Sequence, residues 1–91
     1  MKLENKVAIV TGGGKGIGAE ICLKLAKEGA KIVIAEMDIK SAEDIQKKII
    51  ENKGEAIVVN TNVADEVSVN NMADEAVKKF SKIDILINNA G

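Results

Sequence analysis

The sequence predicts an α/β fold in which a parallel sheet carries helices on both faces. Short apolar runs rich in Val and Ile alternate with longer amphipathic segments, strand then helix three times, followed by a last strand. This alternation is typical of parallel strands joined by right-handed helical crossovers. The 91 residues contain no Pro and no linker-like stretch, so we expect them to belong to a single small domain.

The first strand is predicted over residues 6 or 7 to 10, because this run is apolar throughout, as in a strand buried on both faces. A helix is predicted over about residues 16–28, and Gly29 is expected to end it in the C′ position. Residues at helical spacing are expected on its buried face: Ile17, Ile21 and Leu25, with Cys22 and Ala26 beside them.

The second strand is predicted over residues 31–35. The next helix is expected to begin near Ser41, whose hydroxyl can cap the first turn, with Asp44 approximating a capping box. Asp38 is an alternative cap, and Gly54 is expected to close the helix. Its predicted buried face consists of Ile45, Ile49 and Ile50.

The third strand is predicted over residues 56–59, and the fourth over residues 83–87. Between them, Asp65 can cap a helix that runs to about residue 80. The residues expected to face inward from this helix are Val69, Met72, Ala73, Ala76, Val77 and Phe80.

Composition excludes several classes of function. The formal net charge is −1, which gives no indication of nucleic acid or an acidic membrane as a partner. No apolar run has the length of a membrane span, and the polar N-terminus does not resemble a secretory signal, so we expect a cytoplasmic protein. The single Cys22 cannot form an internal disulfide, and the absence of His argues against a zinc site.

A glycine-rich turn follows the first predicted strand and opens the first predicted helix. Such a turn suits a nucleotide pyrophosphate, since glycines allow close approach of the backbone and the helix N-terminus offers unpaired N–H groups. The spacing Gly12-x-Gly14-x-x-x-Gly18 does not give the dinucleotide pattern G-x-G-x-x-G, whereas residues 11–18 read T-G-x-x-x-G-x-G. The phosphate loop G-x-x-x-x-G-K-[ST] is absent. Taken alone, the cluster is also compatible with an ordinary flexible turn.

All strands of a parallel sheet point the same way, so the segments that leave them meet at one edge, where ligands bind. The sequence therefore predicts that residues 11–18, 36–38, 60–63 and 88–91 lie together. No candidate catalytic residue or metal ligand is found among them.

Two charged residues of this edge have opposite implications for the cofactor. Glu36 lies 18 positions after Gly18, close to the position of an acidic residue that binds the adenosine ribose, and its charge would repel the extra phosphate of NADP. Lys15 could instead pair with that 2′-phosphate. Either residue could also be a solvated surface charge. We weigh Glu36 more heavily, and expect NAD as the preferred cofactor with NADP as the alternative.

Amide side chains follow the last two predicted strands. Asn62, beside Val63, offers a donor and an acceptor to the adenine edge, although Asn is also a common turn residue. Small and amide residues at 88–91, Asn88-Asn89-Ala90-Gly91, would let a cofactor ribose approach closely.

Over its whole length the chain resembles the N-terminal part of a short-chain dehydrogenase/reductase. The T-G-x-x-x-G-x-G turn, Glu36 and Asn-Asn-Ala-Gly occur in that family's order and spacing. The resemblance implies a Rossmann-like, partial doubly wound parallel sheet of order 3-2-1-4, truncated after the fourth strand. The cofactor-binding positions that we predict are Gly12, Gly14, Lys15, Gly16, Ile17, Gly18, Glu36, Asn62, Val63, Asn89, Ala90 and Gly91.

The resemblance also implies roles for these residues. Glycines and Ile17 line the pyrophosphate, Glu36 binds the adenosine ribose, Asn62 and Val63 flank the adenine, and residues 89–91 lie near the nicotinamide-side ribose. The family commonly has Asp at position 62 and Gly at position 81, where this chain has Asn and Ser. We expect the first change to affect adenine binding only slightly and the second to be neutral.

Family members catalyse with a Ser and a Tyr-x-x-x-Lys pair downstream of Asn-Asn-Ala-Gly, and this chain contains no Tyr. Our leading hypothesis is the NAD(P)-binding portion of an oxidoreductase that acts on an alcohol or carbonyl, inactive by itself and homo-oligomeric when full length. The alternative is a non-catalytic dinucleotide-binding or assembly module. We expect the open edge of the fourth strand to make the isolated segment marginally stable or self-associating.

Overall fold

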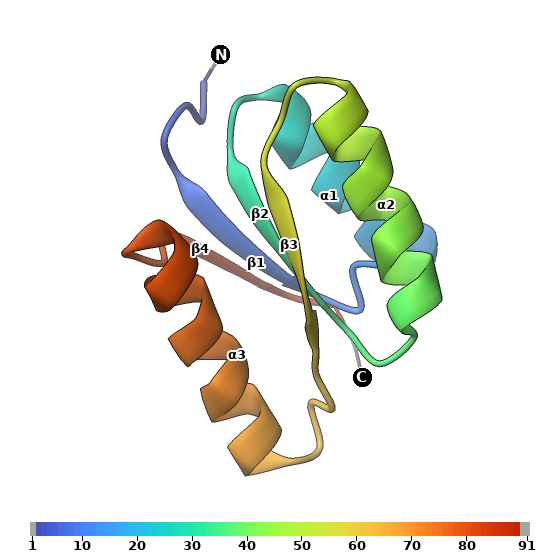
Figure 1. The fold of residues 1–91 in the computed structure, drawn as a ribbon, viewed down its shortest axis with the longest axis vertical. Coiled ribbons are helices and arrows are strands. Elements are labelled where there is room, and N and C mark those ends of the chain that lie inside the picture. The colour runs from blue at the N-terminus through green and yellow to red at the C-terminus, as the bar shows by residue number, and fades with distance from the viewer. Residues whose placement is uncertain (1, 90–91) are drawn as a thin grey trace.

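The computed structural model describes residues 2–89, in which strands and helices alternate as predicted (Figure 1). The strands are β1 (Val7–Thr11), β2 (Lys31–Glu36), β3 (Ala56–Asn60) and β4 (Ile85–Asn88). The helices are α1 (Gly16–Lys27), α2 (Ile39–Glu51) and α3 (Glu66–Phe80). None of these helices is long and apolar enough to cross a membrane.

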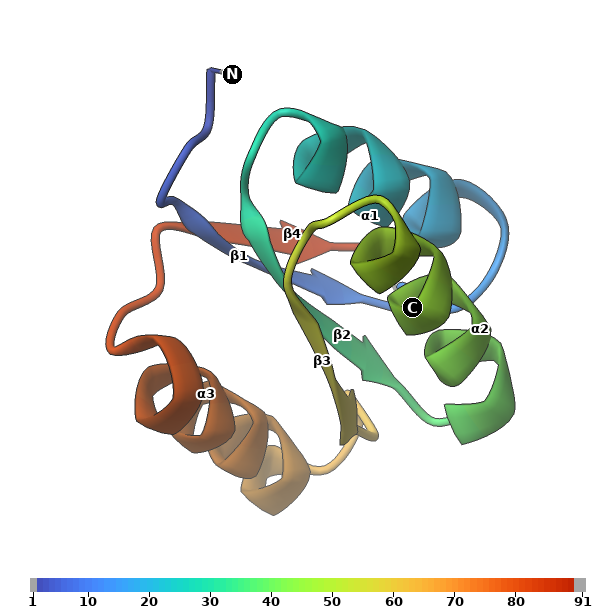
Figure 2. The ribbon, with the colours of Figure 1, turned by 45° about the horizontal axis from the view of Figure 1, so that its top comes forward.

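The strands form one parallel sheet in the order β3-β2-β1-β4, which confirms the predicted topology. Helices α1 and α2 cover one face of this sheet, and α3 covers the other (Figures 1 and 2). The order in which strands are added to the sheet changes direction at β1. Strands β2 and β3 lie on one side of β1, and β4 lies on the other side. The loops after β1 and β4 therefore start side by side.

Alternate residues of the central strands pack into two separate hydrophobic cores, one on each face of the sheet. Ala8, Val10, Ile32 and Ile34 are fully buried against α1 and α2. Val7, Ile9, Val33 and Ala35 point to the opposite face, where they pack with Met72, Ala76 and Phe80 of α3. Burial of both faces explains why β1 and β2 read as continuous apolar runs.

Helix α2 begins earlier than the preferred prediction. Its N-cap is Asp38, whose Oδ1 accepts a hydrogen bond of 3.2 Å from the backbone N–H of Ser41. The predicted start at Ser41 with a capping box to Asp44 is wrong, and the alternative cap is correct. Both residues can cap a helix, but here the carboxylate of Asp38 accepts the hydrogen bond from the N–H of Ser41, so that Ser41 lies inside the first turn.

Three residues predicted on buried helix faces are instead exposed. Ile17 is 71%, Ile50 53% and Val77 47% exposed. Each has a neighbour or a residue one turn away that takes the inward position: the buried helical residues are Gly18, Ala19 and Cys22 in α1, Ala42, Ile45 and Ile49 in α2, and Met72, Ala76 and Phe80 in α3. Adjacent helical residues point about 100° apart. When the buried face of a helix is centred one residue away from its predicted centre, a residue at the edge of the predicted face becomes exposed.

Two features of the turn before β4 also differ from expectation. Ser81 ends α3 in the left-handed conformation, with φ of 73°, where a residue with a Cβ is strained. This conformation favours Gly, which argues against the expectation that Ser is neutral at this position. Strand β4 begins at Ile85, two residues later than predicted. The residue before it, Asp84, lies beside the start of β1, where its Oδ2 accepts a hydrogen bond of 2.9 Å from the N–H of Val7.

Candidate functional site

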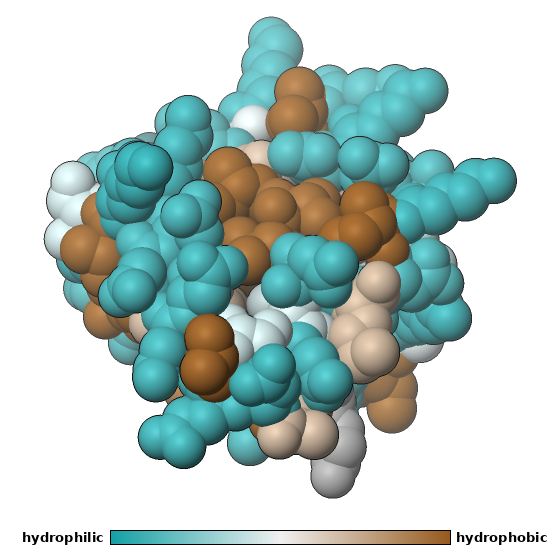
Figure 3. Space-filling view, turned by 60° about the horizontal axis from the view of Figure 1, so that its bottom comes forward, coloured by the Kyte–Doolittle hydropathy of each residue, from teal (hydrophilic) through white to brown (hydrophobic). Residues whose placement is uncertain are grey.

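The loops that follow β1, β2 and β3 and the segment that leaves β4 are joined at one edge of the sheet. The N–H of Gly12 donates to the carbonyl of Ala35 at 2.7 Å, and the N–H of Thr61 donates to the carbonyl of Glu36 at 3.2 Å. On the other side of β1, Thr11 bonds to the segment leaving β4. Viewed from this end, the surface is largely hydrophilic around an exposed apolar area (Figure 3). The predicted convergence is found for the described residues of the four segments, 11–18, 36–38, 60–63 and 88–89.

The glycines of the β1–α1 loop are required for different structural reasons. Gly12 and Gly16 have φ values of 66° and 51°, which favour glycine. A Cβ on Gly18 would collide with the carbonyl of Gly12 and lie 2.7 Å from Nδ2 of Asn89. A Cβ on Gly16 would meet nothing within 4 Å. Gly16 therefore leaves open space beside the start of α1.

The start of α1 differs from the starts of the other two helices. Asp38 and Asp65 accept hydrogen bonds from the first turns of α2 and α3. The N-cap of α1 is Lys15, whose side chain makes no capping hydrogen bond, and the first turn of α1 carries no acidic residue. The positive end of the α1 dipole is thus available to an anion.

Glu36, at the end of β2, is fastened to the glycine loop. Its Oε1 accepts a hydrogen bond of 3.0 Å from the N–H of Gly14, and its Oε2 accepts from the N–H groups of Met37 at 3.1 Å and Asp38 at 3.2 Å. Gly14 is buried, and a Cβ there would lie 2.9 Å from the backbone N of Ala42. Gly14 thus positions Glu36.

Lys15 forms an ion pair with Asp38, with Nζ and Oδ2 2.9 Å apart and side chains 65% and 38% exposed. The hydrogen bond from Lys15, together with those from Ser41, lowers the pKa of Asp38 to about 2. Asp38 in turn raises the pKa of Lys15, and the negative charge of Glu36 adds to this. The pair ties the β1–α1 loop to the start of α2.

The loop after β3 closes the other side of Glu36. A hollow of about 80 Å³ lies between Gly12, Ala35, Glu36, Met37, Thr61 and Val63. Val63 is 39% exposed. The Oδ1 of Asn62 accepts a hydrogen bond of 3.0 Å from the N–H of Ala64, so this side chain shapes its own turn. Gly12, Glu36 and Val63 are brought together as predicted.

The segment after β4 is fixed by Thr11, which is buried. Its Oγ accepts a hydrogen bond of 2.9 Å from the N–H of Asn89 and lies 3.3 Å from the carbonyl oxygen of Ile87. Asn89 therefore lies against the glycine loop, next to Gly18. The predicted positions Ala90 and Gly91 lie outside the described residues.

Sequence reasoning missed the residues that connect the loops. Thr11 and Thr61 are buried, and a hydroxyl at the end of an apolar strand is the signal that could have indicated them. Asp38 was expected at this edge and as a possible helix cap, but its ion pair with Lys15 was not predicted. Gly13 is buried, and a Cβ there would lie 2.8 Å from Sγ of Cys22, so this glycine permits α1 to pack on β1.

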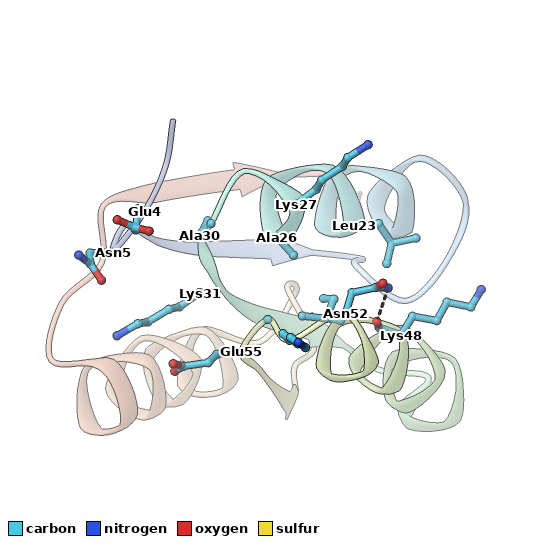
Figure 4. Close-up of a pocket in the computed structure, with 14 residues that line it drawn as sticks. Glu4, Asn5, Leu23, Ala26, Lys27, Ala30, Lys31, Lys48, Asn52 and Glu55 are labelled. Atoms are coloured by element: carbon cyan, nitrogen blue, oxygen red, sulfur yellow. Dashed lines mark hydrogen bonds between the residues drawn. The ribbon is translucent and has the colours of Figure 1, made fainter. Parts of the chain in front are cut away.

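A larger hollow, of about 890 Å³, lies at the opposite end of the sheet (Figure 4). It is bordered by the last turns of α1 and α2 and by the starts of β2 and β3. Leu23, Ala26 and Ile49 contribute apolar surface, while Lys27, Lys48 and Glu55 are charged residues around it. No group of three or more His, Cys, Asp or Glu that could hold a metal occurs among residues 2–89. The polar groups that converge are at the other end, around Glu36.

Cys22 is not available to a ligand, because it is buried. Its side chain is fully buried between α1 and the sheet, and desolvation raises the pKa of the thiol to about 12. Cys22 is therefore a packing residue, as expected.

Known proteins match this chain over almost its whole length. The family model described as short chain dehydrogenase matches residues 6–91. An uncharacterized oxidoreductase of Thermotoga maritima is 46% identical over 97% of the chain, and the 7alpha-hydroxysteroid dehydrogenase of Escherichia coli is 36% identical over 100%. The chain spans about a third of these relatives, 34% and 36% of their lengths.

Solved structures agree with the sequence matches. A 7 alpha-hydroxysteroid dehydrogenase complexed with NADH and 7-oxo glycochenodeoxycholic acid superposes with a TM-score of 0.97 at 37% identity, covering 99% of this chain and 35% of that one. A NAD+-bound xylitol dehydrogenase gives a TM-score of 0.95 at 37% identity, covering 100% and 35%. With its parallel 3-2-1-4 sheet and T-G-x-x-x-G-x-G turn, the chain belongs to the short-chain dehydrogenase family and corresponds to its N-terminal portion.

Proposed function

We propose that residues 1–91 bind a nicotinamide dinucleotide and form the cofactor-binding part of an oxidoreductase. The complete protein would transfer a hydride between the nicotinamide and an alcohol or carbonyl substrate. The observation that carries this proposal is the open N-terminus of α1, set beside the glycine turn and the carboxylate of Glu36. The dinucleotides in the related structures named above support the same cofactor class.

The residues of the site fit such a cofactor. Gly12, Gly16, Ile17 and Gly18 would line the pyrophosphate, since the open space at Gly16 and the dipole of α1 suit an anion. The carboxylate of Glu36 would accept hydrogen bonds from the adenosine ribose. Five further predicted positions would contact the adenine and the nicotinamide-side ribose: Asn62, Val63, Asn89, Ala90 and Gly91.

We further propose that NAD is preferred over NADP. Glu36 lies at the end of β2 with its charge directed toward the glycine loop, where it would repel a 2′-phosphate. Lys15, the residue that could attract this phosphate, is engaged by Asp38.

The test is to measure the Kd values of NADH and NADPH for the complete protein that carries this sequence. Glu36→Gln keeps an oxygen that can accept from Gly14 and removes the charge, so it should weaken NADH binding about tenfold and reduce the preference for NADH. Glu43→Gln, at an exposed position of α2, is the matched control and should change neither value. Tighter binding of NADPH than of NADH by the unaltered protein would contradict the NAD preference.

Catalysis requires residues that we place outside this segment. Relatives about three times as long support a complete protein that supplies a Ser and a Tyr-x-x-x-Lys pair, the catalytic set that the family resemblance implies. The intact mass of the native gene product tests this directly. A mass well above 9.6 kDa agrees with the proposal, whereas a mass of 9.6 kDa would favour a non-catalytic dinucleotide-binding module.

A further inference from the structure

The ion pair between Lys15 and Asp38 joins two loops that both border the carboxylate of Glu36. Asp38 is the fixed partner, because its Oδ1 accepts from the N–H of Ser41 while its Oδ2 lies 2.9 Å from Nζ of Lys15. Lys15 has the longer and more exposed side chain, at 65% exposure. We therefore take Asp38 as the residue that orients the ammonium group of Lys15.

We propose that Asp38 is a specificity-determining residue: by holding Lys15 in an ion pair, it withholds the lysine from the 2′-phosphate of NADP. This inference rests on the proposed function, since it assumes that a dinucleotide binds with its adenosine ribose at Glu36. It assigns cofactor preference to a pair of residues, one on each loop, in addition to the acidic residue at the end of β2.

The local charges support this assignment. Lys15, Glu36 and Asp38 together carry a formal charge of −1, so this corner of the site repels an added phosphate although it contains a lysine. With Asp38 neutral, the same three positions would sum to zero and leave the ammonium without its partner. Lys15 would then be able to donate a charge-assisted hydrogen bond to a phosphate oxygen.

Asp38→Asn separates this role from helix capping. Asn caps helices about as well as Asp, so the first turn of α2 keeps an acceptor for the N–H of Ser41 while the charge is lost. In the complete protein, we expect this variant to lower the ratio of the NADPH Kd to the NADH Kd about tenfold, because it removes a repelling charge and the cost of breaking an exposed ion pair. Asp38→Ser, also a capping residue, should act in the same direction.

A double-mutant cycle with Lys15→Ala decides whether the effect passes through the lysine. In the Lys15→Ala background, Asp38→Asn can only remove a repelling charge, and the ratio should fall about threefold or less. Asp44→Asn, six positions along the same helix, removes an equal charge from an exposed site and should leave the ratio within about twofold of the unaltered protein.

Equal gains from Asp38→Asn with and without Lys15 would overturn the proposal, because the aspartate would then act only as one more negative charge. An unchanged ratio in both capping variants would overturn it as well. Failure of the unaltered protein to bind either NADH or NADPH would overturn the proposed function and this inference together. Binding of NADH without coupling in the cycle would overturn this inference alone. Titration calorimetry gives all Kd values without requiring turnover.

Discussion

The hydroxyl oxygen of Thr11 lies 2.9 Å from the backbone nitrogen of Asn89 and accepts its hydrogen bond. This contact joins residues 78 positions apart and sets the segment after β4 against the glycine loop. Thr11→Val should lower the free energy of unfolding by about 1–3 kcal/mol, because it leaves a part-buried N–H without its acceptor. Thr11→Ser keeps the oxygen and should be milder. Urea denaturation of the complete protein measures both, and equal stability of Thr11→Val and the unaltered protein would contradict the role.

Substitution of two glycines in the same loop should have unequal effects. Gly18→Ala places a methyl group against the carbonyl of Gly12 and near Asn89, so it should cost about 1–3 kcal/mol of stability and disrupt dinucleotide binding. Gly16→Ala meets no protein atom within 4 Å, and its cost should be limited to the strain of φ at 51°, about 1 kcal/mol. Thermal melting with and without NADH compares them. A larger loss of stability for Gly16→Ala than for Gly18→Ala would contradict the close contact of Gly18 with the carbonyl of Gly12.

Acid should weaken the junction between β1 and β4. The hydrogen bond from the N–H of Val7, with the ion pair to Lys82, lowers the pKa of Asp84 below its ordinary value. A carboxylate with a lowered pKa in the folded state stabilises the fold above its unfolded pKa, and this contribution is lost as the pH falls through the folded value. Asp84→Asn should therefore reduce the loss of stability as the pH falls below the ordinary pKa of Asp, 3.8, and through the lowered pKa of Asp84. Denaturant midpoints across this range provide the measurement, and an unchanged pH dependence would count against the assignment.

Ser81 offers a site for stabilisation. Its φ of 73° strains any residue with a Cβ, so Ser81→Gly should raise the free energy of unfolding by about 1 kcal/mol. Ser81→Ala keeps the Cβ and should give no such gain, which makes it the matched control. A decrease in stability for the glycine variant would indicate that the serine side chain contributes more than its backbone strain costs.

The outer edge of β4 should promote association of an isolated polypeptide of residues 1–91. β4 pairs with β1 alone among the described strands, and Leu86 is 59% exposed on it. Unpaired, apolar strand edges associate with other strands, and a lysine at the edge opposes this. Leu86→Lys should therefore reduce concentration-dependent self-association in sedimentation experiments. A monomeric, sharply unfolding unaltered polypeptide would show that the edge is tolerated as it is.

The fold could be predicted from the sequence because the central strands β1 and β2 are buried on both faces and all four strands stand out as short runs rich in Val and Ile. The site segments followed from that topology, since parallel strands deliver their loops to one edge. The connections between those loops were less accessible. Ser41 and Asp38 are both good caps, so the sequence left the start of α2 ambiguous, and the position of Asp38 against Lys15 depended on that choice.

Helix faces were predicted less accurately for a related reason. Val77 and Ala76 are adjacent and both apolar, yet only Ala76 is buried, because it lies one turn from Met72 and one turn from Phe80, on the helix face that packs against the sheet. Spacing alone left both residues as candidates for that face. Likewise, the bond from Asn89 to Thr11 spans almost the entire chain, and no local pattern encodes it.

The three N–H groups that hold Glu36 have an entropic consequence. A glutamate side chain ordinarily samples many rotamers, and fixing it on binding costs conformational entropy. Here the hydrogen bonds from Gly14, Met37 and Asp38 fix the orientation of the carboxylate within the fold itself. A ribose that binds there would require less ordering of this side chain, which favours a lower Kd.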